Sequence, residues 1–127
     1  MKKVKTILTA TILSLITMMH FSCGKDGGGG SVFLPDLSAT WANQANANNT
    51  FNFFGFTSNV STSTYEGNEF SSGTLTGHFT GSFNNHNLNF IYDSGAKTGK
   101  SYSGTIDDAS KTITLTSTTL ASITLIK

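Results

Sequence analysis

The stretch from Ser72 to Phe83 constrains the fold more than any other part of the chain, because two kinds of residue alternate along it without a break. Glycine, leucine and phenylalanine occupy the odd positions, and serine, threonine and histidine lie between them. Successive side chains of a β-strand point to opposite faces, so this stretch predicts a strand with one apolar face. Glycines that alternate with large residues allow a strand to coil sharply, as closure into a barrel requires.

Similar alternation recurs at short intervals along the rest of the chain. We expect further strands, joined by polar turns, at residues 37–41, 50–56, 60–65, 88–92, 102–106, 112–116 and 121–125. No stretch after residue 31 has the 3.6-residue period of a helix. The sequence therefore predicts an all-β antiparallel meander of about eight short strands, for which a barrel is favoured over a sandwich.

Two local features complete the predicted topology. Phenylalanines in the stretch 50–56 fall on both faces of the strand, and we expect Gly55 to form a bulge that returns Phe56 to the core. The polar segment Glu66–Glu69 is expected to be a turn.

One inward face per strand defines the expected interior. Its members are Leu37, Trp41, Phe51, Phe53, Val60, Leu75, Phe79, Phe83, Leu88, Phe90, Tyr92, Tyr102, Ile106, Ile113, Leu115, Ile123 and Leu125. The aromatic residues among them could line a cavity for a ligand, for which we single out Trp41, Phe53, Phe79, Tyr92 and Tyr102. The alternative is that they simply fill the barrel, because eight short strands enclose little more than their own side chains. In that case, any ligand site would be shallow and would lie at one mouth.

The N-terminal segment has the pattern of a secretory signal. Three lysines within Met1–Lys5 precede an uncharged, mostly apolar run, Thr6–Met19, which is shorter than the roughly 20 residues that a transmembrane helix needs. The residues around the only cysteine, Ser22-Cys23-Gly24, resemble the lipobox of bacterial lipoproteins of the Bacteroidota type. The resemblance implies cleavage before Cys23 and lipidation of its thiol, which also accounts for a lone cysteine in an exported chain.

The signal segment and the predicted lipidation site divide the chain into three parts and imply a location. Residues 1–22 would be the signal peptide, residues 23–31 the lipidated cysteine with a glycine-rich linker, and residues 32–127 a single β domain. We expect a lipid-anchored protein of the bacterial cell envelope, held at the outer membrane on either its periplasmic or its surface face.

The β domain resembles the small lipocalin-like barrels of such lipoproteins. The resemblance rests on Trp41 in the first strand, on Gly77-His78-Phe79 and Gly81-Ser82-Phe83, and on Gly104-Thr105-Ile106 before the last strands. Lipocalins usually carry glycine two residues before this tryptophan, where this chain has Ala39. They also cover the tryptophan with an arginine, a residue type that this chain lacks.

The charges and motifs of the sequence exclude several classes of function. All eight basic residues are lysines, and three of them lie in the signal segment, so five remain against seven acidic residues (8 − 3 = 5). Nucleic-acid binding requires a basic face and is excluded. His78 and His86 lack acidic or cysteine neighbours at ligand spacing, and Asp93 and Asp107-Asp108 lack the calcium-loop pattern, so we expect no metal and no cofactor.

The sequence favours a non-enzymatic protein that binds a small apolar molecule or a glycan at a barrel mouth, or that has a structural or surface role. One alternative is a partner-binding subunit of an outer-membrane assembly that uses Phe54 and Phe56 as an exposed apolar patch. The other is a small envelope hydrolase that uses Glu66, Glu69 or the aspartates Asp93 and Asp107, and it requires these carboxylates to converge in one cleft. The oligomeric state stays open.

Overall fold

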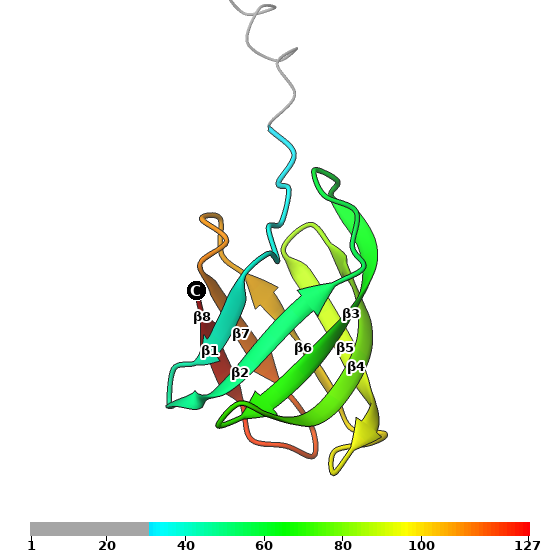
Figure 1. Ribbon diagram of the computed structural model, residues 1–127. Helices are drawn as coiled ribbons and strands as arrows, with labels where there is room; N and C mark the ends of the chain where they lie inside the picture. Colours follow the sequence, from blue (N-terminus) through cyan, green and yellow to red (C-terminus); the bar gives the residue numbers. More distant parts are fainter. Residues whose placement is uncertain (1–30) are drawn as a thin grey trace, which may run out of the picture. The chain divides into compact units, whose positions relative to one another are not determined.

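The computed structural model describes residues 31–127, of which Val32–Lys127 form one compact unit (Figure 1). This unit is an all-β, lipocalin-like barrel of eight antiparallel strands, which confirms the predicted fold class. The strands are β1 (Thr40–Asn43), β2 (Asn46–Phe54), β3 (Thr62–Ser71), β4 (Thr74–Asn84), β5 (Asn87–Gly95), β6 (Ser101–Ile106), β7 (Thr112–Thr116) and β8 (Ile123–Ile126).

Each strand pairs with the strand that follows it in sequence, and β1 pairs with β8 to close the ring. The closing contact is short: Ala42 pairs with Ile126, and Asn43 pairs with Leu125. The strand order therefore decides the question that the sequence left open, in favour of a barrel.

Three strands extend well beyond the ranges that the sequence indicated: β2 and β5 have 9 residues each and β3 has 10, whereas β4, with 11, lies close to the predicted stretch 72–83. The expected turn at Glu66–Glu69 is wrong, since these residues continue β3 and pair with both β2 and β4. Cross-strand pairing overrides the low strand preference of such polar residues, a preference that depends strongly on context. As a result, Gly67 and Glu69 point into the barrel while Glu66 points out.

Bulges lie elsewhere than expected. β2 ends at Phe54, and Gly55 follows it in a turn with φ 72°, after which Phe56 packs against the edge of the core. The pairing shifts instead at Thr76 in β4 and at Asp93 in β5, each of which has no direct partner on the neighbouring strand. On the N-terminal side of the Thr76 bulge, the inward-facing and outward-facing positions of β4 are exchanged. Leu75, which we expected to face the core, is therefore 56% exposed.

The interior is filled by aromatic and aliphatic side chains. Phe79 lies at its centre, stacked on Phe90 with ring centroids 4.2 Å apart and packed against Phe53 at 5.6 Å. Tyr65 joins this core although the sequence analysis did not place it there, whereas Val60 and Ile123 are only partly buried. The buried set is Leu37, Trp41, Phe51, Phe53, Tyr65, Phe79, Phe83, Leu88, Phe90, Tyr92, Tyr102, Ile106, Ile113, Leu115 and Leu125.

The two ends of the barrel differ. We call the end with the β2–β3, β4–β5 and β6–β7 turns the capped end, because residues 32–39 cross it before β1 begins (Figure 1). Leu37 is fully buried there, Phe33 stacks on His86 with ring centroids 3.8 Å apart, and the backbone N–H of Asp36 donates to Ser110 Oγ at 3.2 Å. The opposite end, with the β1–β2, β3–β4, β5–β6 and β7–β8 turns, is the loop end.

Trp41 lies fully buried at the capped end. Its indole N–H donates to the Leu37 carbonyl at 3.1 Å, and Lys127 Nζ lies 5.1 Å from the centroid of its ring. Lys127 Nζ also donates to the Asp36 carboxylate at 2.7 Å. Ala39 has φ 78°, a left-handed conformation that favours glycine.

Candidate functional site at the loop end of the barrel

A buried carboxylate organises the loop end. Glu69 lies near the end of β3 and points inward, where its residue is only 4% exposed. Oε1 accepts hydrogen bonds from Asn49 Nδ2 at 2.7 Å and from Lys97 Nζ at 2.8 Å. Oε2 accepts from the Tyr92 hydroxyl at 2.7 Å and from Lys97 Nζ at 3.0 Å. Three segments of the chain, β2, β5 and the β5–β6 turn, thus meet at one carboxylate.

The charge state of this cluster follows from its contacts. Burial raises the pKa of Glu69, but hydrogen bonds from Lys97, Tyr92 and Asn49 outweigh burial and hold that pKa below its ordinary value. Burial, and then the bond to the Glu69 carboxylate, raise the pKa of Tyr92, so its hydroxyl stays protonated and donates. At neutral pH the cluster therefore holds an ionised carboxylate and a neutral phenol.

A depression of about 320 Å³ opens over the Glu69–Lys97 pair. Its wall carries amide and hydroxyl groups that can both donate and accept hydrogen bonds. It is lined by Asn46, Asn49, Glu69, Ser71, Thr76, Ala96 and Lys97. A second depression, of about 470 Å³, lies at the same end between the β1–β2 turn and the residues around Ser122. The depression over the ion pair is thus lined mainly by polar side chains and has a charged centre.

The five residues that we singled out as ligand-lining lie together in one buried aromatic cluster. Trp41 is at the capped end, and Phe53 and Phe79 are in the middle of the barrel, with their rings packed on one another and on their neighbours. Tyr92 and Tyr102 reach toward the loop end, where their hydroxyls donate to Glu69 and to the carbonyl oxygen of Ala121 at 2.8 Å. Of these five residues, Tyr92 contacts the site directly, through Glu69 and Lys97, whereas the depression itself is lined by other side chains.

The sequence does not predict this site. It offers Glu69 only as a carboxylate of the hydrolase alternative, in an expected turn, and it does not single out Lys97 or Asn49. Alternation could have identified Glu69 as an inward-facing strand residue, because Tyr65, Gly67 and Glu69 occupy every second position, as inward-facing residues do elsewhere in the chain.

The carboxylates of the hydrolase alternative do not share a cleft. Glu69 is inside the barrel, and Asp107 lies in the β6–β7 turn at the capped end, where it accepts backbone hydrogen bonds from residues 111 and 112. Glu66 and Asp93 lie on the outer face and flank His78, with Asp93 Oδ1 2.7 Å and Glu66 Oε2 3.6 Å from its ring nitrogens. The four carboxylates therefore do not converge in one cleft, as the hydrolase alternative requires.

The two histidines that we weighed as metal ligands lie far apart in the fold. His78 is on the outer face of β4, and His86, in the β4–β5 turn, contacts Asp108 Oδ1 at 2.6 Å. Within residues 31–127, no group of three or more His, Cys, Asp or Glu side chains could hold a metal ion.

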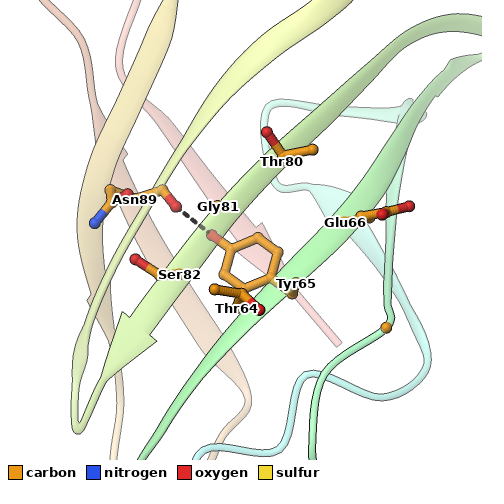
Figure 2. Close-up of a pocket in the computed structure, with 8 residues that line it drawn as sticks. Thr64, Tyr65, Glu66, Thr80, Gly81, Ser82 and Asn89 are labelled. Carbon is orange, nitrogen blue, oxygen red and sulfur yellow. Dashed lines mark hydrogen bonds between the residues drawn. The ribbon is translucent and has the colours of Figure 1, made fainter.

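A groove also runs along the outside of β3 and β4 (Figure 2). The Tyr65 side chain, which is buried in the core, crosses Gly81 under this groove and donates its hydroxyl to the Asn89 carbonyl oxygen at 2.8 Å. Alanine at Gly81 would overlap that same carbonyl, so the glycine is what allows the strands to bend here. Since this tyrosine already has a partner, the groove offers a ligand mainly the hydroxyls of Thr64, Thr80 and Ser82.

The residues of the partner-binding alternative do not form one patch. Phe54 is 39% exposed on the outer face, whereas Phe56 packs partly against the core. Ile91, the next exposed apolar residue in the same cross-strand row, is separated from Phe54 by Glu66 and Thr80. Cys23, the predicted lipidation site, lies outside the described residues.

No family model, curated protein or solved structure matches this chain. Among residues 31–127, no helix is long and apolar enough to cross a membrane.

Proposed function

We propose that this protein is a lipid-anchored, non-enzymatic component of the bacterial envelope that binds a glycan at the loop end of its barrel. The anchor rests on the lipobox resemblance around Cys23 and on the signal-like segment before it. The observation that carries the binding role is the loop-end depression, whose polar wall lies over an interior already filled with aromatic rings.

The filled barrel interior and the polar lining of the loop-end depression together favour a glycan over an apolar molecule as the ligand. An apolar molecule needs a concave, mostly apolar cavity, but here the large apolar side chains pack on one another. Apart from Ala96, the side chains that line the loop-end depression carry amides, hydroxyls and one ion pair. Such groups donate and accept hydrogen bonds in the way that sugar hydroxyls require.

The N-terminal segment enters the barrel at one end, and the candidate site lies at the other. Residues 32–39 join the barrel at the capped end, and the candidate site lies at the loop end. The chain from Cys23 would thus join the barrel at the end opposite the candidate site, and the glycine-rich segment after Cys23 would act as a flexible spacer.

The anchor is tested by metabolic labelling with an alkyne fatty acid in a bacterial host. We expect label on the wild-type chain and none on Cys23→Ser, which should accumulate as unprocessed precursor. Ser22→Ala is the matched control, because it keeps a small residue before the cysteine and should stay labelled. Absence of label on the wild-type chain would contradict the proposal that Cys23 is lipidated.

Ligand binding is tested with the full-length chain, solubilised in detergent, on a glycan array. The variant Asn46→Ala removes one polar group from the depression and should weaken binding about fivefold, the value of one hydrogen bond of about 1 kcal/mol. Asn87→Ala, an exposed asparagine at the capped end of β5, is the control and should bind as the wild type does. Binding of apolar dyes but of no glycan would contradict the proposal.

A further inference from the structure

The loop end already contains a bound ammonium group, and it belongs to the protein. Lys97 Nζ lies 2.8 Å and 3.0 Å from the two oxygens of Glu69 and 5.4 Å from the centroid of the Tyr92 ring. A carboxylate beside the face of an aromatic ring is an arrangement that attracts ammonium ions. The Lys97 side chain is 33% exposed, whereas that of Glu69 is 5% exposed, so the lysine covers the carboxylate from the solvent side.

The carboxylate is held in place without the lysine. Asn49 on β2 and Tyr92 on β5 each donate one hydrogen bond of 2.7 Å to Glu69, one to each oxygen. Departure of Lys97 would leave an oriented carboxylate at the base of the depression. A site of this kind pays little ordering entropy when it takes up another ammonium group.

The lysine can leave without movement of the backbone. Its turn is fixed by hydrogen bonds from Thr98 N–H to the Gly95 carbonyl at 3.2 Å, from Gly99 N–H to the Tyr92 carbonyl at 2.8 Å, and from Lys100 N–H to the Lys97 carbonyl at 2.9 Å. Rotation about the side-chain bonds of Lys97 is therefore sufficient to uncover Glu69. Such rotations are fast in partly exposed side chains.

We propose that the loop end recognises the primary ammonium group of an external ligand, and that Lys97 occupies this position until the ligand displaces it. The amide and hydroxyl groups of Asn46, Ser71 and Thr76 line the same depression as the carboxylate, so the matching ligand carries hydroxyls as well as its ammonium group. That is the chemistry of an amino sugar, and the depression of about 320 Å³ suits a ligand of one or two sugar rings. The inference rests on the proposed glycan-binding function and specifies its ligand.

The test compares glucosamine with N-acetylglucosamine by isothermal titration calorimetry at pH 6.5, with the full-length chain in detergent. Lys97→Met removes the competing ammonium group but keeps an unbranched side chain. If Lys97 occupies the site for nine-tenths of the time, Lys97→Met should bind glucosamine about tenfold more tightly than the wild type. N-acetylglucosamine, which has no ammonium group, should gain nothing, and Glu69→Gln in the Lys97→Met background should abolish the gain.

A second measurement uses the wild-type chain, so it does not depend on how a variant folds. In NMR spectra, titration with glucosamine should move the Lys97 side-chain resonances toward those of a solvent-exposed lysine, and N-acetylglucosamine should not. Equal binding of both sugars by wild type and Lys97→Met would overturn the ammonium site and leave the glycan proposal standing. Absence of glucosamine binding by either form would overturn the ammonium site, whatever the array shows.

Discussion

Gly67 provides the sharpest test of the claim that the barrel interior is filled. Gly67 pairs with Phe53 on β2 and with Phe79 on β4. A methyl group on Gly67 would overlap Cε2 and Cζ of the Phe79 ring and would lie 2.7 Å from the Asn52 carbonyl oxygen. The Phe79 ring cannot easily move away, because it is fully buried and packs on Phe90 at 4.2 Å.

The expected loss of stability in Gly67→Ala follows from these contacts. Overpacking of a closed core costs about 1–3 kcal/mol, and the restricted unfolded chain offsets up to about 1 kcal/mol of it. We expect a net loss of about 2 kcal/mol, which lowers Tm by about 8–16 °C for a domain of this size. Urea unfolding followed by tyrosine and tryptophan fluorescence measures the difference.

A double-mutant cycle identifies the ring as the cause. Phe79→Leu removes the two ring atoms that Gly67→Ala would overlap, although the contact with the Asn52 carbonyl remains. In the Phe79→Leu background, Gly67→Ala should therefore cost about 1 kcal/mol less than in the wild type. Equal costs in both backgrounds would assign the loss to the Asn52 carbonyl and not to the Phe79 ring. No cost in either background would mean that the interior has spare room, and the preference for a glycan at the mouth over an apolar ligand inside would fail.

Two further predictions concern the capped end. Hydrogen bonds from Lys127 and Ser38 lower the pKa of Asp36 from 3.8 to about 2, so its stabilising contribution is complete above pH 4 and is lost as the pH falls toward 2. Because the Asp36 side chain is 57% exposed, we discount the contribution to about 1 kcal/mol, and Asp36→Asn should remove it from unfolding curves compared at pH 5, 3.5 and 2. Ala39→Gly should raise stability by about 0.5 kcal/mol, because the left-handed φ of 78° costs alanine about 1–2 kcal/mol and glycine loses about 0.5–1 kcal/mol to unfolded-state entropy. A fall in the urea midpoint of Ala39→Gly would count against the strained conformation.

Alternation predicted much of the barrel, because it depends only on neighbouring residues. Phe79 and Phe83 point inward as expected, since no bulge interrupts β4 between them. Leu75 lies on the same strand but points outward, because Thr76 is left without a partner where β3 and β4 pair. That shift is a property of the two strands together, so it cannot be read from either one alone.

The candidate site was harder to predict for a related reason. Glu69 and Lys97 are 28 residues apart in the sequence, and they meet only because the β5–β6 turn folds over the end of β3. Glu69 also lies in a polar segment whose composition is typical of turns, and only its pairing with β2 and β4 reveals it as strand. A charged residue that points inward breaks the apolar pattern from which a core is predicted.

One junction between neighbouring strands of the barrel is much weaker than the others. β1 and β8 have four residues each and share two residue pairs, whereas β3 and β4 share ten. Every other junction joins strands that are adjacent in sequence, so it can re-form locally after a fluctuation, but this one must bring together distant parts of the chain. Opening of the barrel should thus begin beside Trp41, the only tryptophan, whose fluorescence would report the first step of unfolding.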